Sequence, residues 1–170
     1  MVLRPTPDAM RERVFAVLGG RTQNAVVLDL FCGTGAVGLE ALSRGADRVV
    51  FVERHRAAAQ LTRVNCSAFD LGDSRAKVMN CAALSAVKKL ADSREKFDLV
   101  WADPPFDDWE DGLRAVCESF SIGLMSTGGL ACLECPEKVD IAGSLPSGLQ
   151  ITRDLTGGAS RVAMIESLKE

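Results

Sequence analysis

The sequence lacks the features that several classes of protein require. It has no run of about 18 apolar residues, the length that a membrane-spanning helix needs. Its first residues, MVLRPTPDAMRERVF, contain no apolar core of the kind that a secretory signal peptide carries. Its only histidine is His55, and one imidazole beside a single Cys-x-x-Cys pair supplies too few ligands for the usual zinc sites. We therefore expect a cytoplasmic protein without a membrane association or a bound metal.

The six cysteines do not suggest a disulfide framework. They are scattered and lie mostly inside apolar segments, as is typical of reduced thiols that pack like small hydrophobic side chains. Cys132 and Cys135 form the Cys-x-x-Cys pair within the strand-like run LACLEC. Because successive side chains of a strand alternate between its faces, this odd spacing predicts that the two thiols point apart.

An excess of positive charge is missing as well. The formal net charge is −3 at pH 7, which is not the charge of a general nucleic-acid binder. Near the N-terminus four arginines outnumber the two acids Asp8 and Glu12, so any contact with nucleic acid is expected there. The basic residues of that segment are Arg4, Arg11, Arg13 and Arg21.

Strand-like and helix-like segments alternate along the chain. Short apolar runs typical of strands covered on both faces occur at 25–31, 48–53, 76–80, 97–102 and 129–135. Helical spacing is found at 36–44, 55–69, 82–91 and after residue 109, and residues 1–22 form a further helical segment. Two last strands, near 150–155 and 161–168, flank the hairpin-like turn TGGAS. The order predicts one α/β domain over 1–170, Rossmann-like and doubly wound, with a mostly parallel seven-stranded sheet and a C-terminal antiparallel hairpin.

A glycine-rich turn follows the first expected strand. In 29-DLFCGTGAVGLEAL-42, Gly33, Gly35 and Gly38 satisfy G-x-G-x-x-G between a strand and a helix, and Glu53 ends the second strand. Glycine lets the backbone approach a ligand closely, and an acid at that position is placed to hold ribose hydroxyls. Either a dinucleotide or S-adenosylmethionine fits this pattern. Asp29 favours S-adenosylmethionine, because a carboxylate there would repel a pyrophosphate and attract an ammonium or a sulfonium.

The strand at 97–102 runs into Asp-Pro-Pro-Phe at 103–106. Pro104 holds Asp103 in an extended conformation, so the Asp103 carboxylate and the Pro104 carbonyl can point the same way. Two adjacent acceptors suit an NH2 group on a planar ring, and Phe106 offers a face on which that ring can stack. A plain turn is the alternative interpretation. If the strand tip opens onto the crevice of the glycine loop, the sequence predicts methyl transfer to an exocyclic amine.

Four segments together resemble the RsmD-type methyltransferases, class I enzymes that modify the guanine N2 amine of small-subunit (16S) ribosomal RNA. The segments are RPTPDAMRERVFAVL, LDLFCGTGAVGLEALSRGA, VFVERHRAAA and ADPPF. The cofactor contacts that the resemblance implies are Asp29, Phe31, Gly33, Thr34, Gly35, Glu53, Arg54, Asn80, Cys81, Ala82 and Asp103. The implied catalytic residues are Asp103, Pro104, Pro105 and Phe106, and the implied substrate contacts are Arg4, Thr6, Arg11 and Trp109.

The resemblance also implies a partner, ribosomal RNA within a small-subunit assembly particle, and we expect a monomer. Residues 1–22 would lie on the substrate side. Two departures matter. Ala82 stands where related enzymes carry a polar residue at the adenine amine, so that adenine recognition would rest on backbone groups or on Asn80. Only three residues precede the RPT motif, where relatives carry a basic hairpin, so we expect either a reduced grip on RNA or an incompletely represented start.

Other interpretations stay open at this point. The same chemistry serves adenine amines in DNA and amide nitrogens in proteins, and a non-catalytic nucleotide-binding module is a third candidate. The module is disfavoured because it would not need Asp103. Among single residues, we expect His55 at the surface or at a helix cap, and Trp101 in the core. Trp109 could flank the target base from a loop or pack in the core.

Overall fold

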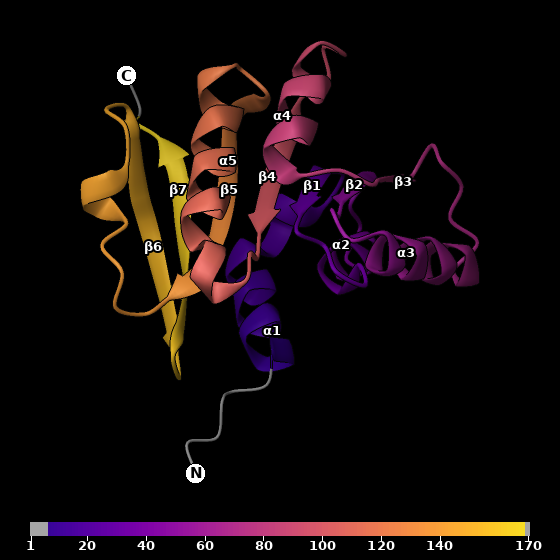
Figure 1. Ribbon diagram of the computed structural model, residues 1–170, viewed down its shortest axis with the longest axis horizontal. Helices are drawn as coiled ribbons and strands as arrows, with labels where there is room; N and C mark the ends of the chain where they lie inside the picture. Colours follow the sequence, from indigo (N-terminus) through magenta and orange to yellow (C-terminus); the bar gives the residue numbers. More distant parts are fainter. Residues whose placement is uncertain (1–6, 169–170) are drawn as a thin grey trace.

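The computed structural model describes residues 7–168, in which helices alternate with the strands of one sheet (Figure 1). The strands are β1 Val26–Leu30, β2 Arg48–Val52, β3 Ala76–Met79, β4 Phe97–Ala102, β5 Met125–Pro136, β6 Leu149–Gly157 and β7 Ser160–Ser167. The helices are α1 Pro7–Leu18, α2 Ala36–Ser43, α3 Arg56–Ala68, α4 Ala83–Ala91 and α5 Trp109–Ser121, with 3-10 turns η1 Gly19–Thr22, η2 Phe106–Asp108 and η3 Ala142–Ser144. Arg4 and Thr6, two of the expected substrate contacts, lie outside the described residues.

The sheet has the strand order β3-β2-β1-β4-β5-β7-β6. β1, β2, β3, β4 and β5 pair in parallel, whereas β7 is antiparallel to both β5 and β6. The predicted Rossmann-like, doubly wound sheet with its C-terminal antiparallel hairpin is therefore confirmed. The strand order reverses between β1 and β4, the place where open α/β sheets bind ligands beyond the carboxyl ends of their strands.

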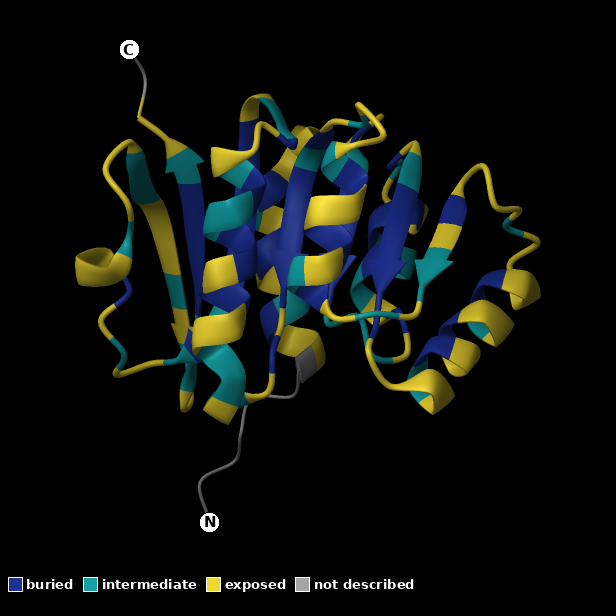
Figure 2. Ribbon diagram, turned by 45° about the horizontal axis from the view of Figure 1, so that its top comes forward, coloured by how far each residue is buried: buried dark blue, intermediate teal, exposed yellow. Residues whose placement is uncertain are grey.

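Helices cover both faces of the sheet, and the strands between them are buried (Figure 2). One core contains residues of α1, α2 and α3, among them Val14 and Ala41, and the other contains residues of α4 and α5. Side-chain alternation along the strands explains the division. Cys132 packs in the first core and Cys135 in the second, which confirms that the two thiols point apart. No helix of the described part is long and apolar enough to cross a membrane.

Helix α1 is fixed to the sheet beside the crevice by an aromatic stack. The rings of Phe15 and Trp101 are stacked with their centroids 5.6 Å apart and their planes at 20°. The guanidinium of Arg44 lies 5.1 Å from the centre of the Phe15 ring on the same stack. Trp101 is therefore a core residue, as the sequence predicts, and it ties α1 to the strand that carries Asp103.

Gly38 lets helix α2 lie directly on strand β2. A Cβ atom at this position would come within 2.2 Å of Phe51 Cε1 and 2.8 Å of Val49 Cγ1. Both neighbours are fully buried in the core, so neither can move aside without disturbing its packing. The third glycine of the motif is thus required by packing.

We predict that Gly38→Ala destabilises the protein by about 1–3 kcal/mol, the usual cost of forcing an extra methyl group into a packed core. Chemical denaturation measures the loss as a fall in the free energy of unfolding. Gly72→Ala is the matched control, because a Cβ at Gly72 would meet no heavy atom within 4 Å. Equal stability of the two variants would contradict the packing argument.

Candidate active site

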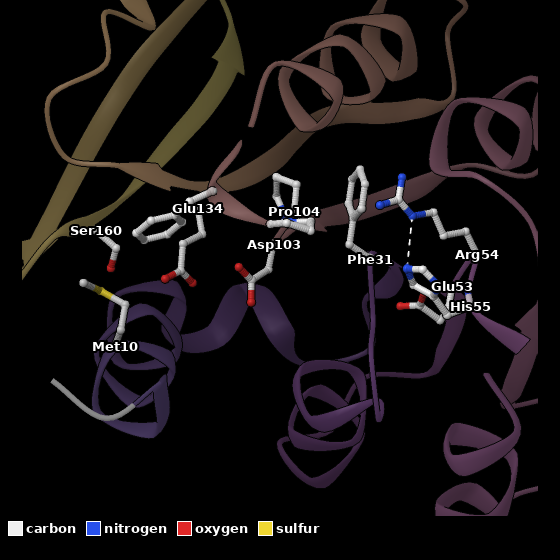
Figure 3. Close-up of a pocket in the computed structure, with 11 residues that line it drawn as sticks. Met10, Phe31, Glu53, Arg54, His55, Asp103, Pro104, Glu134 and Ser160 are labelled. Atoms are coloured by element: carbon white, nitrogen blue, oxygen red, sulfur yellow. Dashed lines mark hydrogen bonds between the residues drawn. The ribbon is translucent and has the colours of Figure 1, made fainter. Parts of the chain in front are cut away.

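The carboxyl ends of β1, β2, β4 and β5 surround a cavity of about 500 Å³ (Figure 3). Its walls are Met10, Phe31, Glu53, Arg54, His55, Asp103, Pro104, Pro105, Phe106, Glu134 and Ser160. A second cavity of about 280 Å³ shares Phe31 and Arg54 with the first and reaches Cys81 and Ala82. Together the two cavities have the size typical of small-molecule sites. The structure thus brings the glycine loop, Glu53 and the Asp-Pro-Pro-Phe segment to one crevice.

The glycine loop is held from two sides. The Gly33 N–H donates a hydrogen bond of 3.0 Å to Glu53 Oε2 at the end of β2. From α3, Thr62 Oγ1 donates to the Gly33 carbonyl at 2.8 Å, and Asn65 Nδ2 donates to the Thr34 carbonyl at 2.9 Å. Neither Thr62 nor Asn65 was expected from the sequence to hold the glycine loop. The only signal for Thr62 was a hydroxyl at a buried position of a helix.

Glu53 is oriented by the backbone and keeps acceptor capacity toward the cavity. It is 7% exposed, its Oε2 accepts the Gly33 N–H, and its Oε1 accepts the His55 N–H at 2.8 Å. A carboxylate offers about four lone-pair sites, so these two bonds leave room for two more donors. A ribose diol supplies two hydroxyl donors. The arrangement fits the predicted ribose contact, whose role stays a prediction.

Phe31 is the residue at which the chain leaves β1. It has φ = 60°, a left-handed conformation that is unusual for a bulky side chain and costs of order 1–3 kcal/mol. Its ring borders both cavities. The backbone is therefore strained at the point where the two cavities meet, as is frequent at ligand-binding sites.

Asp29 lies beneath the glycine loop and does not form part of the wall of either cavity. It is 1% exposed, and its Oδ2 accepts the Gly38 N–H at 3.0 Å. Burial raises the pKa of Asp29 to about 8, and the negative charges of Asp103 and Glu53 raise it further, against the hydrogen bond from Gly38. A cation bound in the crevice would lower this pKa, because it favours the ionised form. The attraction that we expect between Asp29 and a positively charged cofactor would thus act across the glycine loop and not by direct contact.

The raised pKa of Asp29 predicts how stability varies with pH. Between the ordinary value of 3.8 and about 8, the folded protein retains a proton that the unfolded chain releases, so this group makes stability fall as pH rises. Asp29→Asn stays neutral and keeps an acceptor for the Gly38 N–H. We expect the variant to have a flatter pH profile and a higher melting temperature than the wild type at pH 8.

Thermal melts of both proteins without ligand, from pH 5 to pH 9, measure this difference. Two profiles that remain parallel over the whole range would show that Asp29 ionises as an ordinary carboxyl. The two proteins should differ least at pH 5, where Asp29 is neutral in the folded wild type and the loss of stability with rising pH has only begun.

The Asp-Pro-Pro-Phe segment extends from the tip of β4 across the cavity. The Asp103 N–H donates to the Leu30 carbonyl at 3.5 Å, which joins this tip to the end of β1. Asp103 is exposed, Pro104 is buried, and Phe106 begins η2. Helix α5 supports Pro104 through Gly112, where a Cβ would lie 2.7 Å from Pro104 Cγ. Sequence reasoning missed Gly112, although a glycine inside a helix was a signal of close packing.

Of the three residues at 80–82, two border the smaller cavity and one does not. Cys81 and Ala82 border the smaller cavity, as expected of residues near an adenine. Asn80 lines neither cavity, and its Nδ2 donates to the carbonyls of Glu53 at 2.8 Å and of Arg54 at 3.0 Å. The amide therefore fastens the end of β2. Adenine recognition by Asn80 stays a prediction, and the Asn80 amide nitrogen is already engaged elsewhere.

Two expected substrate contacts do not line the crevice. Arg11 forms an ion pair of 3.0 Å with Asp8 and borders a separate cavity beside α2. Trp109 is the first residue of α5, not a loop residue, and it packs partly buried against the core. Helix geometry decides both positions, because each side chain follows the face on which its helix presents it. Substrate binding by either residue stays a prediction.

Arg13 and Arg21, in the described part of the N-terminal segment, are engaged within the protein. Arg13 donates to the Thr156 carbonyl at 2.7 Å. Arg21 forms an ion pair of 2.8 Å with Glu166, and its Nη2 donates to the Gly128 carbonyl at 2.7 Å, near the end of the sheet opposite the crevice. The expectation that this segment contacts nucleic acid stays a prediction.

Arg54 lies at the boundary between the two cavities. Its Nη2 is 3.2 Å from Asp108 Oδ2 in η2, and its Nε donates to His55 Nε2 at 3.3 Å (Figure 3). These contacts connect the end of β2 with the turn after the Asp-Pro-Pro-Phe segment. His55 is exposed at the N-terminal cap of α3, a surface position as predicted.

Glu134 is an acidic cavity residue that was not expected from the sequence. It lies near the end of β5 and lines the cavity beside Asp103 (Figure 3). The signal in the sequence was a single acid in the otherwise apolar run LACLEC. No group of His, Cys, Asp and Glu in the described part of the chain is arranged to hold a metal ion.

Comparisons with known proteins extend over most of the chain. The sequence profile of the family described as "Conserved hypothetical protein 95" matches residues 1–166. The putative rRNA methyltransferase YlbH of Bacillus subtilis is 30% identical over 162 residues, which cover 95% of this chain and 86% of that protein. Ribosomal RNA small subunit methyltransferase D of Haemophilus influenzae is 34% identical over 119 residues, or 69% of this chain and 61% of that protein.

Solved structures have the same fold. The putative methyltransferase yhhF from Escherichia coli superposes with a TM-score of 0.81 at 27% identity, covering 99% of this chain and 89% of that one. The putative methylase HI0767 from Haemophilus influenzae gives a TM-score of 0.82 at 25% identity, covering 97% of this chain and 100% of that one.

Proposed function

Because the chain belongs to the Conserved hypothetical protein 95 family, the RsmD-type methyltransferases, we propose that it methylates ribosomal RNA with S-adenosylmethionine as the methyl donor. The acceptor is the exocyclic N2 amine of a guanine in small-subunit ribosomal RNA. One observation carries the proposal: Asp103 and Phe106 share one cavity with Glu53 and Phe31, the residues expected at the cofactor. A turn without chemical function would not need that position.

The residues present fit the proposed cofactor. Glu53 keeps acceptor sites for two ribose hydroxyls, and a Cβ at Gly33 would meet no heavy atom within 4 Å, so the loop backbone is open to a ligand. Cys81 and Ala82 would border the adenine, and Phe31 the methionine portion. When bound, S-adenosylmethionine supplies a methyl group on a positively charged sulfur, so the acceptor nitrogen needs a free lone pair and no oxidant or strong base.

The residues of the Asp-Pro-Pro-Phe segment position the target amine. The lone pair of an exocyclic amine is delocalised into its ring, which makes the nitrogen a poor nucleophile. Hydrogen bonds from its two protons to the Asp103 carboxylate and the Pro104 carbonyl would aim that lone pair into the crevice. Phe106 would stack on the ring, and the surplus proton departs after the transfer. Orientation of this kind can contribute about 7–11 kcal/mol to catalysis.

We propose that the substrate is a protein-bearing small-subunit particle and that the enzyme acts as a cytoplasmic monomer. Two arguments support this substrate. The net charge is −3, and Arg13 and Arg21 are engaged within the protein, so in the described part of the N-terminal segment these two cations are not available to neutralise phosphates. Affinity for naked RNA should therefore be weak and should fall only slightly with added salt.

The acceptor is identified by transfer of labelled methyl groups from S-adenosylmethionine to total RNA, DNA and protein, followed by nucleoside analysis. The proposal predicts label in N2-methylguanosine of small-subunit RNA. Label in N6-methyladenine of DNA, or in protein amides, would contradict it. Absence of transfer to all three, with assembled particles included, would contradict catalysis itself.

We predict that Asp103→Ala lowers the single-turnover rate by about 100- to 1,000-fold, the usual effect of removing one preorganised polar partner at a reacting centre. Asp103 is exposed at the strand tip, so folding should change little. Phe106→Ala is the companion variant and should weaken binding of the base by ~1–3 kcal/mol through lost stacking. An Asp103→Ala protein with a lower melting temperature but full turnover would mean that the segment is only a turn.

A further inference from the structure

Asp103 and Glu134 stand at the same level on neighbouring strands. β4 and β5 are parallel and pair Ala102 with Leu133, so the residue after each comes next in the same register. Adjacent strands lie about 4.8 Å apart. Both carboxylates therefore belong to one wall of the cavity, and Figure 3 shows them pointing toward the side of Met10. A base bound in the cavity would therefore meet two carboxylates side by side, each opposite a different atom of the base's edge.

The direction of the Glu134 side chain follows from the pleat of β5. Leu133 and Cys135 pack in the core formed with α4 and α5, whereas Cys132 packs in the core formed with α1. Side chains alternate along a strand, so Glu134 points to the α1 side, as Cys132 does. On that side Met10 closes the cavity and Ser160 of β7 borders it. Glu134 is therefore held by the sheet and not by a loop.

The edges of the purine bases differ where such a carboxylate would meet them. Guanine presents an N1–H donor directly beside its N2 amine. Adenine presents, beside its N6 amine, an N1 atom that carries a lone pair and no hydrogen. An ionised carboxylate only accepts hydrogen bonds. It therefore pairs with the guanine N1–H and repels the adenine lone pair, and enzymes that extrude a base read it along this edge.

We propose that Glu134 selects guanine by accepting a hydrogen bond from its N1–H, while Asp103 and the Pro104 carbonyl hold the two protons of N2. This inference rests on the proposed function and assigns the choice of base to one residue. The selection acts through attraction of guanine and repulsion of adenine together, the combination that specific sites use. Glu134 contacts the substrate but takes no proton from the reacting nitrogen, so its loss changes discrimination more than the chemistry of the amine.

The test uses a base analogue that separates the two donors of guanine. 2-Aminopurine keeps the N2 amine but has a lone pair, and no hydrogen, at N1. Small-subunit particles are reconstituted with RNA that carries guanosine or the 2-aminopurine riboside at the position that the wild-type enzyme methylates. Single-turnover rates on the two particles give one ratio for each protein, and this ratio does not depend on the fraction of protein that is folded.

The wild type should methylate guanosine roughly 10- to 100-fold faster than 2-aminopurine, the discrimination expected of one well-placed hydrogen bond. Glu134→Gln offers an amide that can also donate to the N1 lone pair, so its ratio should fall to within about threefold of unity. Glu137→Gln makes the same change at an exposed position three residues further on and should keep the wild-type ratio.

The outcomes separate this inference from the proposed function. If the wild type forms N2-methylguanosine but the Glu134→Gln ratio equals that of the wild type, Glu134 does not read N1 and the inference falls alone. A wild-type ratio near unity would overturn it in the same way. If the wild type forms no N2-methylguanosine in any RNA, the proposed function falls, and the assignment of Glu134 falls with it.

Discussion

The hydrogen bond from the Gly33 N–H to Glu53 is the contact on which the site depends. It joins the loop after β1 to the end of β2, and the His55 N–H occupies the other carboxylate oxygen. Without it, a buried carboxylate would lose a partner, at a cost of about 1–3 kcal/mol or more. The same bond fixes the loop that begins with the strained Phe31. One interaction thereby sets the position of the loop and the direction of the acid that is expected to hold the ribose.

The ends of four strands place four carboxyl groups around one crevice. They belong to Asp29, Glu53, Asp103 and Glu134, on β1, β2, β4 and β5 or immediately after them. Their effect on one another is visible in Asp29, whose pKa rises through burial first and through Asp103 and Glu53 next. Asp29 is therefore largely neutral at pH 7, whereas Glu53, Asp103 and Glu134 line the cavity itself, and carboxylates there favour a positively charged cofactor and disfavour phosphates. A base entering the crevice would therefore have to leave its phosphates outside.

Close packing of helices on the sheet holds the residues of the crevice in place. Gly38 brings α2 onto β2, and Gly112 brings α5 onto Pro104, so both walls of the crevice are supported by close helix packing. Positions built on strands and packed helices move less than positions on loops. Asp103 and Glu134 share a register because β4 and β5 are hydrogen-bonded directly beneath them. The two residues proposed to recognise the base are thus positioned by the sheet itself.

Strands and helices could be predicted because their signals are local. Unbroken apolar runs marked β1, β2 and β4, and the glycine pattern marked the crevice, since each depends on a few neighbouring residues. Glu134 could not be found in that way. Its position beside Asp103 depends on the pairing of β5 with β4. That pairing brings together residues that are distant in the sequence, such as Ala102 and Leu133, which are 31 positions apart. The direction of Arg11 and the bonds of Asn80 also depend on tertiary contacts that no local pattern contains.

Calorimetric titration with S-adenosylmethionine, on the wild type and on Glu53→Gln, tests whether Glu53 holds the cofactor. The wild type should bind S-adenosylmethionine and give no heat with NAD. Glu53→Gln should bind S-adenosylmethionine at least roughly 10-fold more weakly, because hydrogen bonds to a charged group are lost. Binding of NAD without any response to S-adenosylmethionine, or an unchanged affinity in Glu53→Gln, would contradict the account.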